Sequence, residues 1–238
     1  MSMELLAAGA RKLGFELTAH QLSQFEVYYR ELTDWNQRMN LTHITDHSEV
    51  QLKHFLDALT VTLVWPAKPN PRVIDIGTGA GIPGIPLKIL RPEIMLVLLE
   101  ATAKKTVFLK HIVDTLEVSG VEIMAGRAED LAHDTRYRER CDLALARAVA
   151  SLPALVELTL PFCAIGGRFI SQKKGNVDEE INQSLKATKL MGGRLLEVKK
   201  IEMTEFPDQR CLVVYEKVAP TSKEYPRRSG MPATKPIV

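Results

Sequence analysis

The sequence predicts an α/β fold: a seven-stranded, mostly parallel sheet with an antiparallel last strand, preceded by a helical extension. Three observations lead to this prediction. A short apolar run that ends in an acid is followed by glycines at alternate positions within residues 72–84. From there, β-rich runs alternate with helix-like runs, which is the pattern of a parallel sheet covered by helices. The last two β-rich runs have only a short link between them, so they are expected to pair antiparallel.

Residues 1–65 are predicted to form helices. Apolar side chains recur at steps of three and four residues along an amphipathic stripe made of Leu22, Phe25, Tyr29, Leu32 and Trp35. A second helix is expected to begin at Ser48–Glu49 and to continue its apolar face to Leu63. Three prolines in residues 66–71 forbid a helix or a central strand there, so this stretch is interpreted as a linker.

After the linker, the predicted elements alternate. The expected strands are Val73–Ile76, Met95–Leu99, Val121–Met124, Asp142–Ala146, Gly167–Gln172, Arg194–Ile201 and Arg210–Glu216. The expected helices are Ile85–Leu90, Ala103–Leu116, Leu152–Phe162 and Val177–Met191. Pro86 fits this scheme only if it lies in the first turn of its helix. The predicted domains are a helical extension, a linker, a ligand-binding domain and a basic, irregular tail, at 1–65, 66–71, 72–217 and 218–238.

Composition narrows the class of protein. The 238 residues are 45% apolar and 25% charged, as in ordinary soluble globular proteins, and no apolar run is long enough to span a bilayer. No basic leader precedes an apolar stretch at the start, so no secretory signal is expected. The three cysteines, Cys141, Cys163 and Cys211, are far apart in sequence, which argues against a disulfide framework or a zinc site. We therefore expect a cytoplasmic protein with free thiols, no metal and no membrane partner.

The glycine turn indicates the kind of ligand. Gly77, Gly79 and Gly81 form a turn at the carboxyl end of a buried strand, where a ligand can approach the backbone closely. The carboxylate of Asp75, just before them, would repel a phosphate and attract a cationic ligand. S-adenosylmethionine has a sulfonium, an ammonium and a ribose but no phosphate, so it is the expected cofactor. Gly79, Gly81 and Gly84 also satisfy the G-x-G-x-x-G pattern, which leaves a dinucleotide as the alternative.

Acids at the carboxyl ends of the next strands are candidate cofactor contacts, because ligands bind at that edge of such a sheet. Glu100 follows the second predicted strand, where its carboxylate can accept hydrogen bonds from ribose hydroxyls. After the third strand, Ala128 would let the backbone lie close to an adenine ring, and Glu129 or Asp130 could accept from its amine. Either acid could instead cap a helix, and the spacing does not decide which of them contacts adenine.

Arg147 follows the fourth predicted strand, at the position expected to face the transferred methyl group. Its planar donor fork could contact guanine O6, a phosphate or the methionine carboxylate, and a surface ion pair is the simpler alternative. The sequence lacks the Asn/Asp-Pro-Pro-Tyr motif typical of methylation at exocyclic amines. No cysteine follows the fourth or fifth strand where it could attack a pyrimidine. Arg147 is therefore the candidate catalytic residue, as a positioning group, and no general base is expected.

Basic residues gather at the end of the chain, although the formal net charge is only +2. Residues 217–238 hold five Lys and Arg against one Glu, and clustered positive charge can dock on phosphate even when the total is near neutral. Arg227 and Arg228 in this tail, with Lys173 and Lys174 after the fifth strand, are the candidate RNA contacts. Three histidines of the N-terminal region, His43, His47 and His54, do not have the spacing of zinc ligands. We expect them on a helix surface or facing RNA.

Several separate segments together resemble one known family. They are Asn40-Leu41-Thr42, the run from Asp75 to Lys88, Gly126-Arg127-Ala128-Glu129, Arg147-Ala148 and the tail segment from Tyr225 to Gly230. On these segments the sequence is identified as a member of the bacterial ribosomal RNA small subunit methyltransferase G family, also known as glucose-inhibited division protein B. The resemblance covers nearly the whole chain, and the segments agree in order.

The resemblance implies a Rossmann-like, class I S-adenosylmethionine-dependent methyltransferase. The implied acceptor is N7 of one guanine in 16S ribosomal RNA of the 30S subunit, near the decoding site. The family's cofactor contacts fall on Gly77, Ile82, Ala128, Glu129 and Arg147, with Glu100 in the acidic position after the second strand. Two departures are mild. Ile82 stands where many members have Phe, and the run Gln172-Lys173-Lys174-Gly175 lacks the Leu or Met expected before its lysine–glycine pair.

Guanine N7 carries a free lone pair near neutral pH, so it can attack the sulfonium methyl without first losing a proton. Catalysis is then expected from alignment of N7, the methyl carbon and sulfur, with polar groups stabilising negative charge toward O6. Three alternatives stay open: a methyltransferase that acts on a protein or small molecule, a dinucleotide-dependent oxidoreductase, and a protein that only senses the cofactor. The sequence leaves open whether free RNA, an assembly intermediate or the mature 30S subunit is the substrate; a monomer is expected.

Overall fold

The computed structural model of the chain describes residues 2–147 and 149–238. The strands are β1 (Arg72–Ile76), β2 (Met95–Glu100), β3 (Val121–Ala125), β4 (Cys141–Arg147), β5 (Cys163–Lys174), β6 (Gly193–Ile201) and β7 (Arg210–Lys217). The α-helices are α1 (Glu4–Lys12), α2 (Ala19–Met39), α3 (His47–Val50), α4 (Asp57–Leu59), α5 (Gly84–Leu90), α6 (Ala103–Thr115), α7 (Ala128–Leu131), α8 (Leu152–Thr159), α9 (Asp178–Leu190) and α10 (Met231–Thr234). A π-helix and two 3₁₀ segments are η1 (Gln51–Leu56), η2 (Thr60–Val64) and η3 (Leu160–Phe162).

The sheet confirms the predicted topology. Its seven strands lie in the order β3-β2-β1-β4-β5-β7-β6, and β1 to β5 are parallel. β7 pairs antiparallel with both β5 and β6. The strand β5 begins at Cys163, earlier than the predicted Gly167, because Cys163 already pairs with Cys141 before an irregularity in the ladder. Pro86 is the third residue of α5 and so lies in the first helical turn, as the sequence required.

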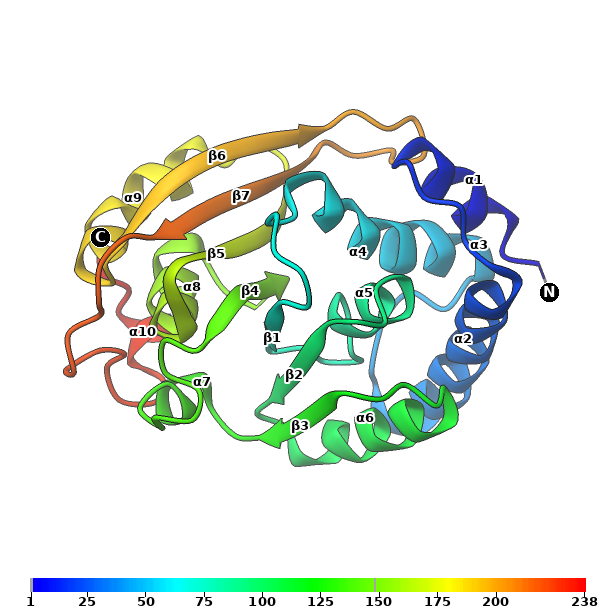
Figure 1. Cartoon of the computed structure of the whole chain (residues 1–238), viewed down its shortest axis with the longest axis horizontal. Coiled ribbons are helices and arrows are strands. Elements are labelled where there is room, and N and C mark those ends of the chain that lie inside the picture. Colours follow the sequence, from blue (N-terminus) through cyan, green and yellow to red (C-terminus); the bar gives the residue numbers. More distant parts are fainter. Residues whose placement is uncertain (1, 148) are drawn as a thin grey trace.

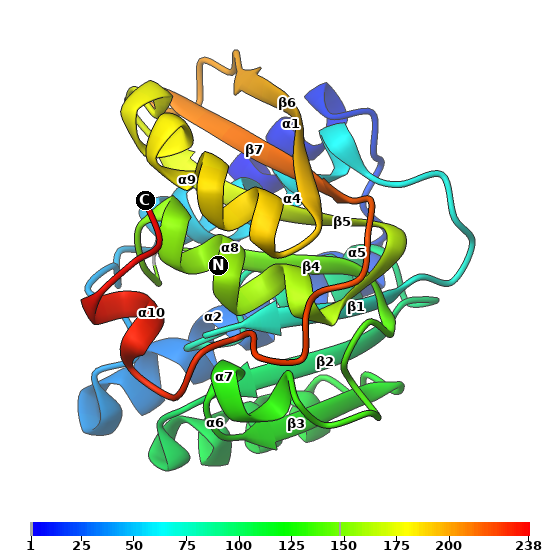
Figure 2. The same ribbon diagram turned by 90° about the vertical axis from the view of Figure 1, so that its left-hand side faces the viewer.

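Helices cover the two faces of the sheet, and strand residues alternate between two cores. Val73, Leu96 and Leu143 belong to the core shared with the N-terminal helices, α5 and α6. Their sequence neighbours Ile74, Val97 and Ala144 belong to the core shared with α7, α8 and α9. Figures 1 and 2 show the sheet between these two helical layers. The carboxyl ends of the parallel strands are therefore left as the open edge of the fold.

The N-terminal helices pack onto the sheet and reach that edge. A capping box between Thr18 and Gln21 starts α2, which buries Phe25, Tyr28 and Leu32. The hydroxyl of Tyr28 donates to the carbonyl of Ala80 at 2.5 Å, which fastens α2 to the glycine turn. The second helical run, from α3 to η2, contains the π-helix η1. A π-helix inside a longer helical run is often found at a functional site.

The tail after β7 is held against the domain. It contains the short helix α10, so it is not irregular throughout. The guanidinium of Arg138 donates to the backbone carbonyls of Thr221, Ser222 and Tyr225, which lie beyond the end of β7. Figure 2 shows the tail running past α7 and α8. Among the described residues, no helix combines the length and the apolar character needed to cross a bilayer.

Candidate functional site

The glycine turn after β1 has the backbone that its sequence pattern predicted. Gly77, Gly79 and Gly81 have φ angles of +67°, +60° and +90°, in the left-handed region that favours glycine. A Cβ atom on Gly77 would lie 2.7 Å from a side-chain carbon of Val149, and one on Gly81 would lie 2.4 Å from Ile85. Conformation therefore favours glycine at all three positions, and lack of space adds to this at Gly77 and Gly81.

Asp75 supports this turn from beneath. Its side chain is fully buried, and Oδ2 accepts hydrogen bonds from Thr78 Oγ1 at 2.6 Å and from the Gly84 amide at 2.9 Å. Burial raises the pKa of Asp75 to about 6, although both hydrogen bonds act in the opposite direction. Its Oδ1 is buried with no hydrogen-bond partner among the described residues. A contact between Asp75 and the cofactor stays a prediction; what the geometry provides is support for the turn.

Glu100 ends β2 and is tied to the same turn. Its carboxylate accepts from the amide of Gly79 at 2.9 Å and from the amide of Thr102 at 2.7 Å, and the residue is 6% exposed. Each carboxylate oxygen has a second lone pair, so both can still accept from another donor. The predicted pairing with ribose hydroxyls is therefore compatible with the bonds that Glu100 already makes.

A cavity of about 340 Å³ lies over the turn, and we call it the cofactor cavity. Gly77, Gly79, Ile82 and Arg147 line it, as the predictions grouped them, together with the loop 41–44 that follows α2. The backbone of the turn, the small apolar side chain of Ile82 and the cation of Arg147 thus share one space. Three other predicted contacts, Asp75, Gly81 and Glu100, are not among the lining residues.

Ala128, Glu129 and Asp130 lie at the start of α7, beside the end of β2, but they do not line the cofactor cavity. The amide of Gly126 donates to the carbonyl of Glu100 at 3.0 Å, which joins these two ends. The carboxylate of Glu129 accepts from the Gly230 amide at 2.7 Å, and that of Asp130 accepts from the Ser229 hydroxyl at 3.0 Å. Both acids are therefore engaged by the tail.

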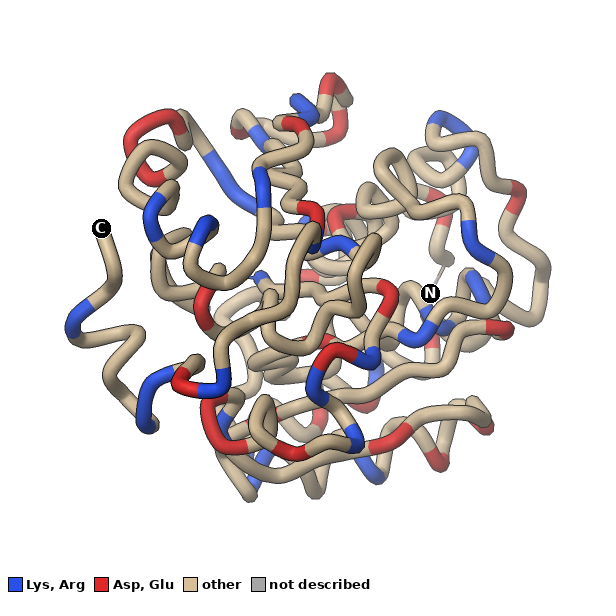
Figure 3. The backbone as a smooth tube through the Cα atoms, turned by 60° about the vertical axis from the view of Figure 1, so that its left-hand side comes forward, with Lys and Arg blue, Asp and Glu red and all other residues tan. Residues whose placement is uncertain are grey.

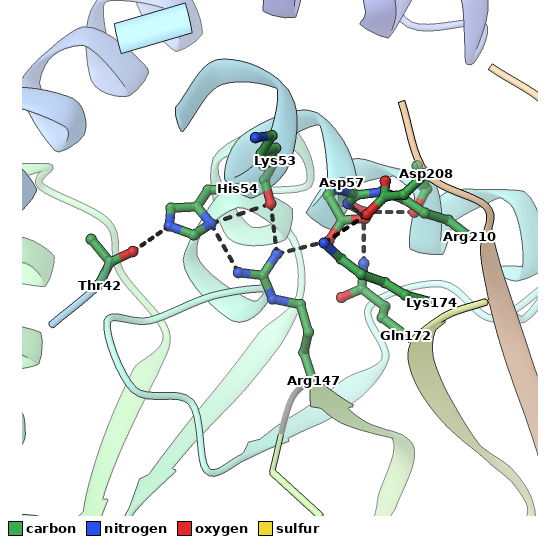
Figure 4. Close-up of polar contacts among 10 residues, drawn as sticks. Thr42, Lys53, His54, Asp57, Arg147, Gln172, Lys174, Asp208 and Arg210 are labelled. Atoms are coloured by element: carbon green, nitrogen blue, oxygen red, sulfur yellow. Dashed lines mark hydrogen bonds and ion pairs between the residues drawn. The ribbon is translucent and has the colours of Figure 1, made fainter. Parts of the chain in front are cut away.

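Arg147 lies in a buried polar network at the end of β4 (Figure 4). Its Nη1 donates to Asp57 Oδ2 at 2.7 Å and to the Lys53 carbonyl at 3.0 Å, and its Nη2 donates to His54 Nδ1 at 3.0 Å. The side chain of Asp57 is 8% exposed and that of Arg147 18%. The ion pair that was the simpler alternative for Arg147 thus exists, but it is buried between β4 and the N-terminal helices.

His54 is buried, so the prediction that it lies on a helix surface is wrong. Burial and the nearby Arg147 cation lower its pKa to about 4, which keeps the ring neutral near pH 7. Since Nδ1 accepts from Arg147, the proton is assigned to Nε2, which donates to Thr42 Oγ1 at 2.7 Å. The histidine thereby connects Arg147 to the loop 41–44.

A second cavity of about 300 Å³ adjoins the first, and we call it the acceptor cavity. Ile44, His54 and Arg147 line both cavities. Gln172 and Arg210 line only the acceptor cavity, and two of their buried atoms, Gln172 Oε1 and Arg210 Nη2, have no hydrogen-bond partner among the described residues. A buried acceptor and a buried donor without partners indicate that a polar group can bind there.

The candidate RNA contacts differ in their ion pairs and in their exposure to solvent. Lys173 and Lys174 line the acceptor cavity and pair with Glu180 and Asp208 at 2.7 and 2.8 Å, and the Lys174 side chain is 63% exposed. Arg227 makes a bidentate pair with the buried Glu157, whereas Arg228 is exposed. Figure 3 shows Lys and Arg (blue) interspersed with Asp and Glu (red) rather than gathered on one face.

The network contains two residues that the sequence analysis did not single out as site residues, Asp57 and Arg210, and Thr42, which was named only as part of a family segment. One signal was present for Asp57. Val50, His54 and Asp57 fall at positions i, i+4 and i+7, so a histidine and an acid lie in line with a core residue of the same helical run. Polar residues at core-facing positions mark a buried polar network, because an unpaired buried charge is costly.

This chain is similar to known proteins both in sequence and in fold. The family model for GidB, described as rRNA small subunit methyltransferase G, matches residues 21–211. A ribosomal RNA small subunit methyltransferase G from Dehalococcoides mccartyi is 50% identical over 99% of this chain and 100% of that protein. The fold is similar to that of a SAM-dependent methyltransferase from Aquifex aeolicus, with a TM-score of 0.55 and 15% identity over 75% of this chain and 97% of that one. It is also similar to Aeropyrum pernix fibrillarin with natively bound S-adenosyl-L-methionine, with a TM-score of 0.51 and 15% identity over 67% and 72% of the two chains. The chain therefore belongs to the GidB family, the rRNA small subunit methyltransferase G family.

Proposed function

We propose that this protein methylates N7 of a single guanine in 16S ribosomal RNA. Membership of the family makes it an rRNA methyltransferase that uses S-adenosylmethionine, and it overturns the dinucleotide oxidoreductase alternative. The observation that supports N7 as the acceptor atom comes from the acceptor cavity. Its two candidate bases, His54 and Asp57, already accept hydrogen bonds from Arg147. An acceptor with a free lone pair needs no general base, and guanine N7 is such an acceptor.

The residues around the cofactor cavity fit the cofactor. Gly77 and Gly79 present backbone without a side chain to this cavity, and Glu100 keeps lone pairs for ribose hydroxyls. Ile82 offers an apolar surface and Arg147 a cation to the same space. S-adenosylmethionine supplies a methyl group on a positively charged sulfur. We propose that Ala128 and Glu129 line the adenine end, beside Glu100.

The acceptor cavity is proposed to hold the guanine. Arg210 offers an unpartnered donor that suits O6, and Gln172 offers an unpartnered acceptor that suits the N1–H group. The nearby cations of Arg147 and Arg210 disfavour protonation of N7 and stabilise negative charge that develops toward O6. Arg147 lies where the two cavities meet, so it can align the acceptor with the methyl group.

The proposal extends to the form of the substrate. Single-stranded RNA loops expose the base edge that carries N7, so the target guanine is proposed to lie in such a loop of the small subunit. The exposed Lys174 and Arg228 are proposed to contact phosphates on either side of it. The protein is proposed to act as a monomer in the cytoplasm.

Transfer of a labelled methyl group tests the function. The protein is incubated with labelled S-adenosylmethionine and either free 16S RNA or 30S particles that lack the modification, and the labelled nucleotide is identified. A single 7-methylguanosine is the expected product, and the better of the two substrates identifies the natural one. Label on another atom of guanine would reject N7. No incorporation, with cofactor binding confirmed by calorimetry, would reject the RNA acceptor in favour of a protein or small molecule.

A further inference from the structure

Asp57 was absent from the predicted site, yet it lies at the centre of the polar network in Figure 4. We propose that Asp57 is a positioning residue for methyl transfer, which fixes the guanidinium groups of both Arg147 and Arg210. Its Oδ2 accepts from Arg147 Nη1 at 2.7 Å, and its Oδ1 accepts from Arg210 Nη1. The inference rests on the proposed function, because it concerns the same reaction.

The segment that carries Asp57 accepts hydrogen bonds from side chains at the ends of two strands, β4 and β5. Arg147, at the end of β4, donates to three acceptors of this segment: the Lys53 carbonyl, the His54 ring and the Asp57 carboxylate. The side-chain amide of Gln172, near the end of β5, donates to the Asp57 backbone carbonyl at 2.7 Å. One residue of the N-terminal helices therefore sets the position of side chains from both strands.

Arg210 is held as firmly as Arg147. Its side chain is 2% exposed, and its guanidinium stacks on the ring of Phe206 with 4.4 Å between the guanidinium carbon and the ring centroid. Besides Nη1, which is bonded to Asp57, its Nε donates to Asp208 at 2.8 Å. These contacts leave Nη2 as the donor without a partner among the described residues. The carboxylate of Asp57 thus decides which nitrogen of Arg210 stays available to an acceptor base.

The charge balance makes Asp57 necessary for this arrangement. In the acceptor cavity, the three cations Arg147, Lys174 and Arg210 share two carboxylates, those of Asp57 and Asp208. Asp57 alone is shared by both arginines. An amide at this position keeps one acceptor oxygen, but its NH₂ group cannot accept from the second guanidinium. The two buried arginines would then repel each other, and Arg147 would leave the junction of the two cavities.

The test is Asp57→Asn in the full-length protein, with 16S RNA as the methyl acceptor. The readout is the single-turnover rate of 7-methylguanosine formation, divided by the number of molecules that bind S-adenosylhomocysteine. This normalisation removes misfolded protein from the comparison. We expect a fall of about 10- to 100-fold, because a small displacement of a positioning group has a large effect on rate. The matched control is Asp134→Asn, which breaks an exposed pair with Arg136 and leaves the normalised rate unchanged.

A double-mutant cycle separates positioning from general stability. Because Asp57 is proposed to act through both Arg147 and Arg210, Asp57→Asn is expected to lower the normalised rate of Arg147→Ala by a smaller factor than it lowers the rate of the wild type. Fully multiplicative effects of the two substitutions would overturn the inference. A wild-type rate in Asp57→Asn would overturn it as well, without touching the proposed function. Wild-type protein that forms no 7-methylguanosine would instead reject the proposed function and this inference with it.

A second variant covers the case in which Asp57→Asn does not fold. Asp57→Asn combined with Arg210→Gln removes one charge of each sign, so the net charge of the buried network is unchanged. Its normalised rate is expected to lie about tenfold below that of Arg210→Gln alone, because Arg147 still lacks its carboxylate partner. Equal rates for these two variants would overturn the inference.

Discussion

His54 illustrates how burial sets the protonation state of one residue in this site. The pKa of its ring is lowered from 6.5 to about 4, first by burial and then by Arg147. The unfolded chain therefore takes up this proton at a higher pH than the folded chain does. The contribution of neutral His54 to stability is fully present above pH 6.5 and is lost as the pH falls from 6.5 to 4. The difference in pKa corresponds to about 3 kcal/mol of unfolding free energy.

The substitution His54→Gln tests this dependence. A glutamine can accept from Arg147 and donate to Thr42, but it does not titrate. Between pH 6.5 and 4, the wild type is expected to lose about 3 kcal/mol more unfolding free energy than the variant, as measured by urea denaturation. Asp75, whose pKa of about 6 acts in the opposite direction, is present in both proteins and cancels in the difference. Parallel stability curves would contradict the prediction.

Single residues also show what the sequence could predict and what it could not. Gly77, Glu100 and Arg147 could be proposed as site residues from the sequence because each comes at the end of a recognisable strand, and a strand end fixes where its next residue lies. Asp57 was not found, since its partners Arg147 and Arg210 come 90 and 153 residues later in the chain. A contact across such a distance depends on the whole packing, which no local pattern specifies.

At the scale of elements, the glycine turn after β1 is expected to tolerate substitution poorly. Gly81→Ala is expected to lower the affinity for S-adenosylhomocysteine at least about tenfold, measured by calorimetry. Its φ of +90° strains any side chain by about 1–2 kcal/mol, and the added carbon would lie 2.9 Å from the Tyr28 hydroxyl, which holds the turn.

Gly166→Ala is the matched control for this prediction. Gly166 has a similar φ of +83°, but a Cβ there meets no atom within 4 Å. This variant is expected to lose a similar amount of unfolding free energy through backbone strain while keeping its affinity for S-adenosylhomocysteine. If both variants lost affinity equally, strain alone would account for the effect, and the role assigned to the turn would be wrong.

Among the elements, strands were easier to predict than the helical run before them. The buried strands are continuous apolar runs, so their positions could be read to within a few residues, as for β2 at Met95–Glu100. The π-helix Gln51–Leu56 has no such signature; it packs against α1 and receives hydrogen bonds from Arg147, which comes about 90 residues later in the chain. It is this segment that carries His54 and leads into Asp57.

At the scale of the whole molecule, segments from both ends of the chain complete the site of the central domain. The loop 41–44 lines both cavities, and the tail binds the two acids at the start of α7. Composition alone assigned the tail to RNA, because it is rich in Lys and Arg. The structure divides this charge: Arg227 faces the buried Glu157, whereas Arg228 is exposed.

Substitutions of these two neighbouring arginines should therefore affect different properties, protein stability for Arg227 and RNA binding for Arg228. Arg227→Gln leaves the carboxylate of Glu157, which is fully buried, without its cationic partner. It is expected to lower the unfolding free energy by about 3 kcal/mol, measured by urea denaturation, with little change in the salt dependence of RNA binding.

Arg228→Gln should change the unfolding free energy by less than about 0.5 kcal/mol, since no ion pair involves Arg228 among the described residues. Its log–log slope of RNA affinity against salt should instead fall by about one, as for a lost phosphate contact. An unchanged slope in Arg228→Gln would remove the tail from the RNA interface, whereas an unchanged stability in Arg227→Gln would show that the tail is not anchored through Glu157.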